Sequence, residues 1–198
     1  MRSLFKFKKK ETKIFCIGLP KTGTTSLTQA LDILGYSALH YPDNPIEQAR
    51  NYDAMSDSPV ALHYKELDIN YPGARFILTL RDESSWLRSL KEHQSKLPTP
   101  KEGTRAYELR LKTLGSPQYN KAKHTKAYKD HLLDVSNYFS GREKDLLIVD
   151  FISGSDGWTE LCRFLGKDIP SQAFPKANVK SSASLREKAE ADLKKQKL

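Results

Sequence analysis

A short stretch near the start of the chain, IFCIGLPKTGTTS (Ile14 to Ser26), concentrates residue types that bind phosphate. Its cation and its hydroxyl groups are Lys21, Thr22, Thr24 and Thr25. The apolar residues before Gly18 predict a buried strand, and Thr24 opens a helical pattern, so the loop between them leads into a helix start. Backbone N–H groups and the positive end of the helix dipole bind anions at such a point. The stretch therefore predicts a phosphate-binding loop.

The loop differs from the common nucleotide-binding (Walker A) pattern in the position of its lysine. Gly18 and Gly23 have the spacing of that pattern, but Thr24 occupies the lysine position. Lys21 lies inside the loop instead. From there we expect it to approach the phosphate from another side than the Walker A lysine does, and to reach the bridging oxygen at the terminal group of a nucleotide. The alternative is a glycine-rich turn that binds nothing. We favour phosphate binding because the cation and the hydroxyl groups cluster where it would use them.

Arg81 is the second candidate for anion binding. It directly follows the apolar run 75–80, which predicts a buried strand, and Ser89 follows eight residues later in a predicted helix. Because ligands of parallel sheets bind at the carboxyl ends of the strands, Arg81 is expected at the edge that carries the first loop. A guanidinium suits a second phosphate through paired hydrogen bonds. The structural alternative is a salt bridge from Arg81 to Asp82 or Glu83.

Strands and helices are expected to alternate along the chain. The predicted strands are 14–17, 36–40, 75–80 and 146–149, and the predicted helices are 24–34, 46–52, 60–69, 84–96, 119–139 and 158–165. Residues 98–116 are rich in proline, glycine and charges and are expected to form an irregular excursion. The alternation predicts an α/β fold, a three-layer, P-loop-type parallel sheet with helices on both faces, in a single domain.

Most of the formal net charge of +9 lies in the two terminal segments of the chain. We interpret residues 1–12 as a basic, flexible tail, 13–180 as the α/β domain and 181–198 as a C-terminal helix or tail. Because the basic residues do not gather on the folded part, a nucleic-acid partner is not expected. No apolar run is long enough for an integral membrane segment and no signal peptide is recognised, which predicts a cytoplasmic protein.

The two cysteines and the histidines do not predict a metal site. Cys16 in the first strand and Cys162 on the last helical stripe are expected to be buried thiols. Zinc-type spacing is not present, and the five histidines are scattered. Of these, only His131 is considered for chemistry.

Together these segments resemble the sulfotransferase family. GLPKTGTTSL (18–27) is similar to the family's loop for the 5′-phosphosulfate. RFILTLRDESSWLRSL (75–90) is similar to its 3′-phosphate element, in which a strand-ending Arg is followed by a Ser eight residues later. A bacterial and fungal branch of the family shares further segments, at 57–59, 64–68, 71–72, 115–116, 127–128, 138–139, 157–166 and 174–175. One departure is Ser26, where steroid- and phenol-type members commonly carry an aromatic residue that stacks on adenine.

The resemblance implies transfer of a sulfuryl group from 3′-phosphoadenylyl sulfate (PAPS) to a hydroxyl or amine, with 3′-phosphoadenosine 5′-phosphate (PAP) as the product. The implied donor-binding residues are Lys21, Thr22, Gly23, Thr24, Thr25, Ser26, Arg81 and Ser89. Lys21 would stabilise the charge that grows on the leaving phosphate oxygen. Since lysine and backbone amides neutralise this leaving group, no metal is expected.

Asp57 is the candidate for the base that removes the acceptor's proton. It lies between the two phosphate elements, after a short predicted strand and before Pro59. The structural alternative is a helix N-cap, because Asp-Ser-Pro is a favourable helix start. His131 is a second candidate base.

The acceptor is expected to be a small molecule or a glycan, with residues 98–131 shaping its site. A homo-oligomer is a possibility through a predicted helix over Ser184–Leu198, which has a narrow apolar stripe. Two other functions stay open. One is a nucleotide-dependent phosphotransferase with a variant P-loop, in which Asp150 would hold magnesium. The other is a nucleotide-binding module without catalysis.

Overall fold

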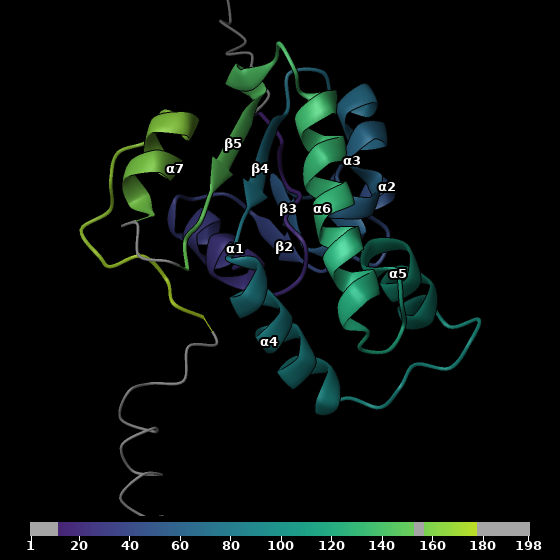
Figure 1. Cartoon of the computed structure of the whole chain (residues 1–198). Coiled ribbons are helices and arrows are strands. Elements are labelled where there is room, and N and C mark those ends of the chain that lie inside the picture. The colour runs from purple at the N-terminus through teal and green to yellow at the C-terminus, as the bar shows by residue number, and fades with distance from the viewer. Residues whose placement is uncertain (1–11, 153–156, 178–198) are drawn as a thin grey trace, which may run out of the picture.

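A parallel sheet of five strands forms the centre of the computed structural model, which describes residues 12–152 and 157–177 (Figure 1). The strands are β1 (Ile14–Cys16), β2 (Ala38–His40), β3 (Ala54–Ser56), β4 (Arg75–Thr79) and β5 (Leu146–Val149). Their order across the sheet is β2-β3-β1-β4-β5. Cys16 of β1 lies opposite Ser56 of β3 and Ile77 of β4. The residues that follow β1, β3 and β4 therefore leave the sheet at the same edge.

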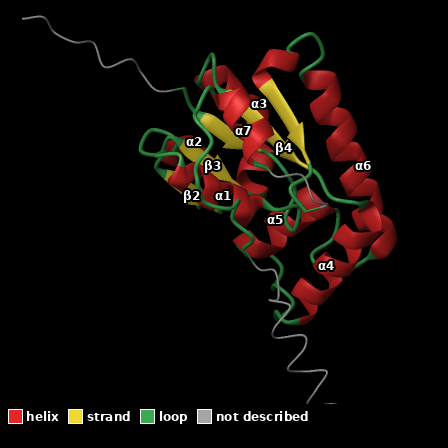
Figure 2. Ribbon diagram, turned by 90° about the vertical axis from the view of Figure 1, so that its left-hand side faces the viewer, coloured by secondary structure: helices red, strands yellow, loops and turns green. Residues whose placement is uncertain are grey.

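Helices cover both faces of the sheet (Figures 1 and 2). One face carries α1 (Thr24–Ile33) and α7 (Trp158–Leu165), and the other carries α2 (Pro45–Gln48), α3 (Ser58–Asn70) and α6 (Lys121–Tyr138). Two further helices, α4 (Glu83–Ser95) and α5 (Arg105–Leu114), lie beyond the carboxyl ends of the strands. A short 3₁₀ turn, η1 (Glu143–Asp145), leads into β5.

Alternate residues of each strand supply two separate cores. Phe15 and Phe76 pack against the α3 and α6 side, where aromatic rings meet at 5.6 Å between centroids. Cys16 and Ile77 pack against the α1 and α7 side. Strands buried on both faces read as continuous apolar runs, which is why β1 and β4 were predictable from the sequence. The predicted fold class is confirmed, and both cysteines are buried thiols as expected.

The region 98–116 differs from its prediction, because it contains a regular helix, α5. The Thr104 hydroxyl accepts a hydrogen bond from the backbone N–H of Tyr107 and so caps the start of this helix, and Gly115 ends it. Among the α5 residues, only Leu109, Thr113 and Leu114 are buried. A ten-residue helix with so few buried positions shows little apolar periodicity in the sequence. The prediction therefore followed the prolines and charged residues around it.

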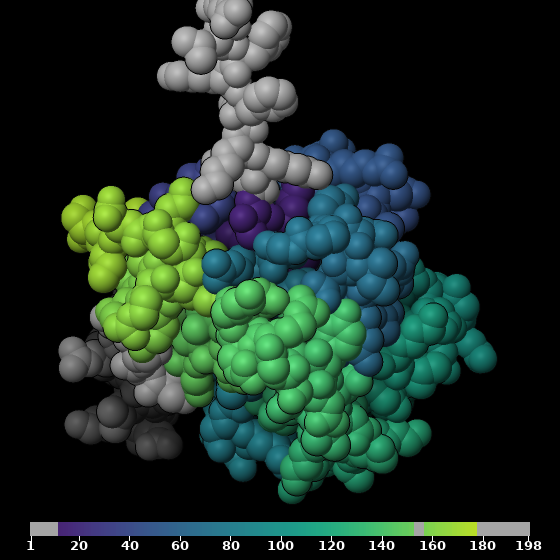
Figure 3. Space-filling view, turned by 90° about the horizontal axis from the view of Figure 1, so that it is seen from above, coloured from purple at the N-terminus to yellow at the C-terminus, as the bar shows by residue number. Residues whose placement is uncertain are grey.

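An ion pair joins α3 to the α6–β5 connection. It lies at the end of the molecule that Figure 3 views from above, opposite the carboxyl ends of the strands. Two guanidinium nitrogens of Arg142 donate to the two carboxylate oxygens of Asp68, at 2.6 and 2.9 Å. The Tyr138 hydroxyl donates to the same carboxylate at 2.8 Å. The Arg142 guanidinium and the Tyr138 hydroxyl hold the pKa of Asp68 below its usual range, although burial of the carboxyl opposes them.

Replacing Asp68 by Asn is expected to lower the free energy of unfolding by about 2 kcal/mol, because charge-assisted hydrogen bonds are lost and water screens them only in part. The side chain of Asp68 is 9% exposed and that of Arg142 is 37% exposed. The contribution is full above the usual carboxyl pKa of about 4 and is lost as the pH falls through the lowered pKa of Asp68. Urea unfolding at pH 7 and pH 3 measures both effects.

The matched control is Asp130→Asn, which breaks the exposed pair between Lys126 and Asp130. It is expected to cost less than about 1 kcal/mol. Equal losses in the two variants at pH 7 would contradict a special role for the Asp68 pair.

Several expectations fall outside the described residues. These are the basic tail, the 181–198 segment and the helix over Ser184–Leu198. Within residues 12–152 and 157–177, no helix has both the length and the apolar character needed to cross a membrane.

Candidate active site

Gly18 and Thr22 hold the loop after β1 against the end of β4. A Cβ atom at Gly18 would overlap the hydroxyl group of Thr79, so this approach needs glycine. The Thr22 hydroxyl lies 2.6 Å from the Thr79 hydroxyl and donates to the carbonyl of Leu19, also at 2.6 Å. Thr22 is fully buried. Of the predicted donor-binding residues, Thr22 is thus the one whose side chain points into the protein and fixes the loop.

The start of α1 presents backbone N–H groups at the mouth of this loop. Gly23 enters the helix with φ 105°, and Lys21 has φ 72°. The N–H groups of Thr24 and Thr25 have no partner within the helix, and no acceptor for them lies in the described part of the chain. The first turn carries no acidic residue. Unpaired N–H groups and the positive end of a helix dipole are the two features that the predicted anion site requires.

The ammonium group of Lys21 is half-buried beside the loop. Burial lowers the pKa of Lys21, and the nearby positive charge of Arg81 lowers it further, while Asp57 and Glu92 act in the opposite direction. An anion bound nearby would stabilise the charged form of Lys21, because it would offset the burial and the repulsion from Arg81.

Arg81 joins the second anion-binding element to the first. Its Nη1 donates to the carbonyl oxygen of Lys21 at 3.1 Å, and its Nε donates to the hydroxyl of Ser85 at 3.0 Å. The predicted alternative, a salt bridge to Asp82 or Glu83, is not what the structure shows, since Asp82 instead caps α4. Burial lowers the pKa of Arg81, and Asp150 opposes this effect.

Two aromatic residues fix the backbone of both elements. The indole N–H of Trp86 donates to the carbonyl of Pro20 at 2.8 Å, and the Trp86 ring lies 4.6 Å from that of Tyr128. The Tyr128 hydroxyl donates to the carbonyl of Arg81 at 2.7 Å and accepts from its N–H at 3.2 Å. The loop and the end of β4 are therefore preorganised relative to one another.

Ser89 lies one helical turn beyond Ser85 and on the same side of α4. It is half-buried, and its hydroxyl has no hydrogen bond to the residues that the structure describes. Its part in binding a 3′-phosphate stays a prediction.

Asp57 takes the capping role that the sequence offered as the alternative to a base, and it also contacts the first turn of α1. Its Oδ1 accepts hydrogen bonds from the backbone N–H of Ser58 and, at 2.9 Å, from the Ser58 hydroxyl, so Asp57 caps α3. Its Oδ2 accepts from the hydroxyl of Thr24 at 3.0 Å, at the start of α1. The carboxylate is therefore both a cap and a member of the site. Asp57 has φ 81°, in a region that L-residues seldom adopt.

His40 is the site residue that sequence reasoning missed. Its Nε2 lies 3.3 Å from Asp57 Oδ2 and 3.3 Å from the hydroxyl of Thr25. Its Nδ1 lies 2.9 Å from the hydroxyl of Ser56. The available signal was its position at the end of a predicted strand, because the ends of neighbouring parallel strands meet.

Ser26 faces a segment near the end of the described chain. Its hydroxyl accepts a hydrogen bond from the N–H of Ala177 at 3.0 Å, and the residue is buried. Ser26, the position at which other members carry an aromatic residue, is thus covered by the segment that contains Ala177.

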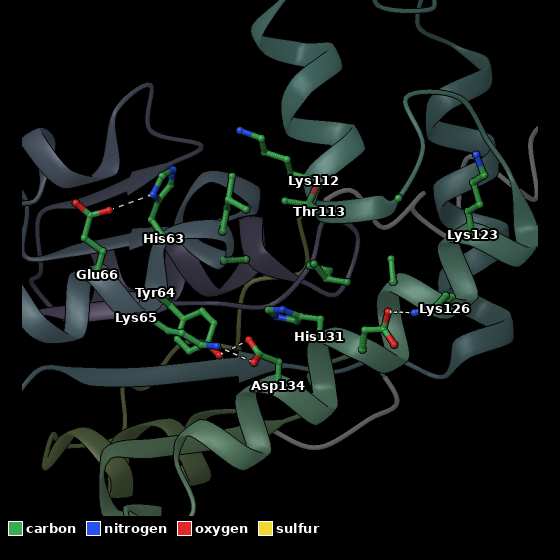
Figure 4. A pocket seen from close by; sticks show the side chains of 16 residues that line it. His63, Tyr64, Lys65, Glu66, Lys112, Thr113, Lys123, Lys126, His131 and Asp134 are labelled. Atoms are coloured by element: carbon green, nitrogen blue, oxygen red, sulfur yellow. Dashed lines mark hydrogen bonds and ion pairs between the residues drawn. The ribbon is translucent and has the colours of Figure 1, made fainter.

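A cavity lies between α3, α5 and α6, apart from these residues (Figure 4). It has a volume of about 800 Å³, and its lining includes His131, Tyr64 and Leu19. Lys21, Asp57 and Arg81 are not among its lining residues. The His131 Nε2 donates to the carbonyl of Ile17 at 2.7 Å. This histidine therefore hydrogen-bonds the backbone just before the loop that follows β1, and it does not contact Asp57.

Asp150 follows β5, the neighbour of β4. Its Oδ1 accepts from the backbone N–H of Ile152 at 2.8 Å. Across residues 12–152 and 157–177, no cluster of three or more histidine, cysteine or acidic side chains has the arrangement of a metal site.

Comparisons with known proteins relate the chain to one family. The sequence profile of the family described as "Sulfotransferase domain" matches residues 13–51 and 46–183. A curated relative, Ava biosynthesis cluster protein M of Aspergillus versicolor, is 25% identical over 210 aligned residues, which cover 82% of this chain and 79% of that protein.

Two solved structures share the fold. The sulfotransferase of Alicyclobacillus acidocaldarius superposes with a TM-score of 0.53 at 18% identity, covering 91% of this chain and 90% of that one. The mouse sulfotransferase SULT7A1, solved in complex with PAP, superposes with a TM-score of 0.52 at 19% identity, covering 93% of this chain and 66% of that one.

Proposed function

The chain belongs to the sulfotransferase domain family, and on that basis we propose that it transfers a sulfuryl group from PAPS to a hydroxyl or amine of an acceptor. The acceptor is proposed to be a small molecule or a glycan. PAP, the ligand of the mouse structure, would be the product left in the donor site.

The observation that carries this proposal is the link between two anion-binding elements. Arg81 reaches the carbonyl of Lys21 at 3.1 Å, so the loop after β1 and the end of β4 form one continuous surface. PAPS carries one phosphate on the 5′ oxygen of its ribose and another on the 3′ oxygen, and PAP keeps both. A nucleoside triphosphate carries all of its phosphates on the 5′ oxygen and has no need for the second element.

Donor binding is proposed to divide between the two elements. The 5′-phosphosulfate would lie at the start of α1, on the N–H groups of Gly23, Thr24, Thr25 and Ser26 and on Lys21. The 3′-phosphate would lie on Arg81 and Ser89. Because Thr22 is buried, its part is to hold the loop through Thr79.

In the transfer, the acceptor oxygen or nitrogen attacks sulfur as the bond from sulfur to the bridging phosphate oxygen breaks. Negative charge then grows on that bridging oxygen, where the Lys21 ammonium would stabilise it without any reorganisation. The acceptor must lose its proton, and Asp57 at the opposite side of Thr24 is the candidate base. No metal ion is required by this scheme, since Lys21 and the helix start carry the needed positive charge.

Calorimetric titration of the full chain with PAP, ADP and ATP tests the donor class without an acceptor. We expect PAP to bind more tightly than ADP, and with an affinity that magnesium leaves unchanged. A preference for ATP with magnesium would instead support the phosphotransferase function. Binding of PAP without any turnover of PAPS would support a non-catalytic module, and binding of no nucleotide would overturn the donor site itself.

A further inference from the structure

Gln94 carries two buried polar atoms that no other part of the described chain satisfies. The residue is 8% exposed, and neither its Nε2 nor its Oε1 has a hydrogen-bond partner among residues 12–152 and 157–177. Gln94 shares the buried face of α4 with Trp86 and Leu90, at intervals of one helical turn. An apolar side chain would continue this face, so the buried amide lowers the stability of the protein unless a further partner binds it.

The Gln94 side chain lines a cavity beside the end of α4. The cavity has a volume of about 260 Å³, several times the space that one water molecule needs. Its walls come from α4, from the chain that follows it, from α5 and from the segment before α6, and they include Lys91, Leu97, Arg110, Pro117 and Tyr119. Gln94 therefore faces a space that is large enough for a small organic molecule.

The charged groups that line this cavity are positive. Lys91 and Arg110 both line it, and no acidic side chain of the described residues does so. The Arg110 Nη1 donates to the carbonyl of Pro117 at 3.2 Å, which fixes one wall. The Lys91 ammonium lies 5.8 Å from the centre of the Tyr119 ring on another wall. The cavity therefore favours an anionic group.

The amide and the two cations together define the chemistry of a matching ligand. A primary amide donates from its nitrogen and accepts at its oxygen, side by side. A carboxylate only accepts, so it would satisfy Nε2 of Gln94 and leave Oε1 without a donor. A hydroxyl group on the neighbouring carbon supplies that donor, whereas an ammonium group there would be repelled by Lys91 and Arg110. Leu97, Pro117 and the Tyr119 ring provide apolar contacts for a small hydrocarbon group.

We propose that this cavity is a second binding site, for a small hydroxy acid whose hydroxyl group is on the carbon next to the carboxylate. Gln94 Nε2 donates to the carboxylate and Gln94 Oε1 accepts from the hydroxyl group. Lys91 and Arg110 balance the negative charge. The site goes beyond the proposed sulfuryl transfer and does not depend on it.

Helix α4 separates the hydroxy-acid site from the donor loop. Lys91 and Ser95 are one helical turn apart and both line the cavity. Glu92 and Lys96 project from a different side of the helix, and their charges influence the pKa of Lys21 in the donor loop. A ligand in the cavity is therefore expected to bind without displacing PAP.

NMR of the full chain tests the site with mandelate, which has a carboxylate, a neighbouring hydroxyl group and a phenyl ring. We expect the side-chain N–H signals of Gln94, identified by their loss in Gln94→Met, to shift as mandelate is added. Phenylacetate lacks the hydroxyl group and phenylethanediol lacks the carboxylate, and we expect each to bind at least about 10-fold more weakly. Gln94 signals that do not move with mandelate, or equal binding of the three compounds, would overturn the inference.

The variant Gln94→Met separates a ligand-binding glutamine from one that serves only the fold. It is expected to weaken mandelate binding by about 10-fold. It should also raise the melting temperature of the ligand-free protein, because apolar atoms replace two buried polar atoms. A glutamine needed for the fold predicts a lower melting temperature and an unchanged affinity for mandelate, and that result would contradict the site. Gln29→Met, at an exposed glutamine of α1, is the matched control and should change neither quantity.

Calorimetry with PAP distinguishes this site from the proposed function. We expect the affinity for PAP to be the same with and without saturating mandelate. Competition between the two ligands would place mandelate in the donor site and overturn the second site. If PAP fails to bind while mandelate shifts the Gln94 signals, the donor assignment is wrong and the hydroxy-acid site stands.

Discussion

Replacing Lys21 by Ala is expected to lower the rate of PAPS turnover by at least about 100-fold, which corresponds to a loss of about 3 kcal/mol of transition-state stabilisation. The reason is that, in the proposed reaction, the ammonium group would lie where charge grows on the leaving oxygen, in a half-buried place where solvent cannot replace it. Binding of PAP should weaken much less, because the backbone N–H groups at the start of α1 are unchanged. Turnover measured at saturating PAPS, together with calorimetry, separates these two effects.

Two control variants separate the charge of Lys21 from the strain of its backbone and from the loss of a lysine elsewhere on the surface. Lys21→Asn also removes the charge, but Asn tolerates the φ of 72° better than Ala does, so equal losses would assign the effect to the charge. Lys144→Ala removes an exposed lysine of η1, at the opposite end of the molecule, and should leave turnover unchanged. Normal turnover in Lys21→Ala would rule out the proposed role of this lysine.

Replacing Arg81 by Ala is expected to weaken PAP binding by about 10- to 100-fold, because a guanidinium that binds phosphate contributes about 1.5–3 kcal/mol. Adenosine 5′-phosphate, which lacks the 3′-phosphate, should lose much less. The ratio of the two affinities, measured by calorimetry, therefore falls in the variant. Some loss for both ligands is expected as well, since Arg81 Nη1 also holds the carbonyl of Lys21.

The variant Ser85→Ala separates the two functions of Arg81. It removes the partner of Nε at 3.0 Å and leaves the charge in place. We expect a small and equal change for PAP and adenosine 5′-phosphate. If Arg81→Ala weakened both ligands equally, Arg81 would be a support of the loop and the 3′-phosphate would bind elsewhere.

The parts of the site that were predictable are those encoded within one segment. The strand, loop and helix start around Lys21 lie in a single run of residues, and their apolar and glycine pattern is strong. Arg81 was predictable because it lies two residues after the end of β4, a strand of five residues buried almost throughout. In both cases the local pattern and the tertiary structure agree.

His40 was not predictable in the same way, because its place in the site depends on residues from three separate segments. β2 has three residues, all only partly buried, so its pattern is weak. The hydrogen-bonding partners of His40 are Ser56 of β3 and Thr25 of α1. Hydrogen bonds between side chains on different strands leave no periodicity in the sequence, and the sheet order that creates them is a tertiary property.

The burial of Trp86 gives the molecule a built-in optical reporter of its donor site. Its indole is fully buried, hydrogen-bonded to Pro20 in the phosphate loop, and in contact with the tyrosine that holds Arg81. The only other tryptophan, Trp158, packs in the separate core beneath α7. Intrinsic fluorescence of a Trp158→Phe variant would therefore arise from a single emitter beside both anion-binding elements. Donor occupancy could then be followed in real time on unlabelled protein, before any acceptor is identified.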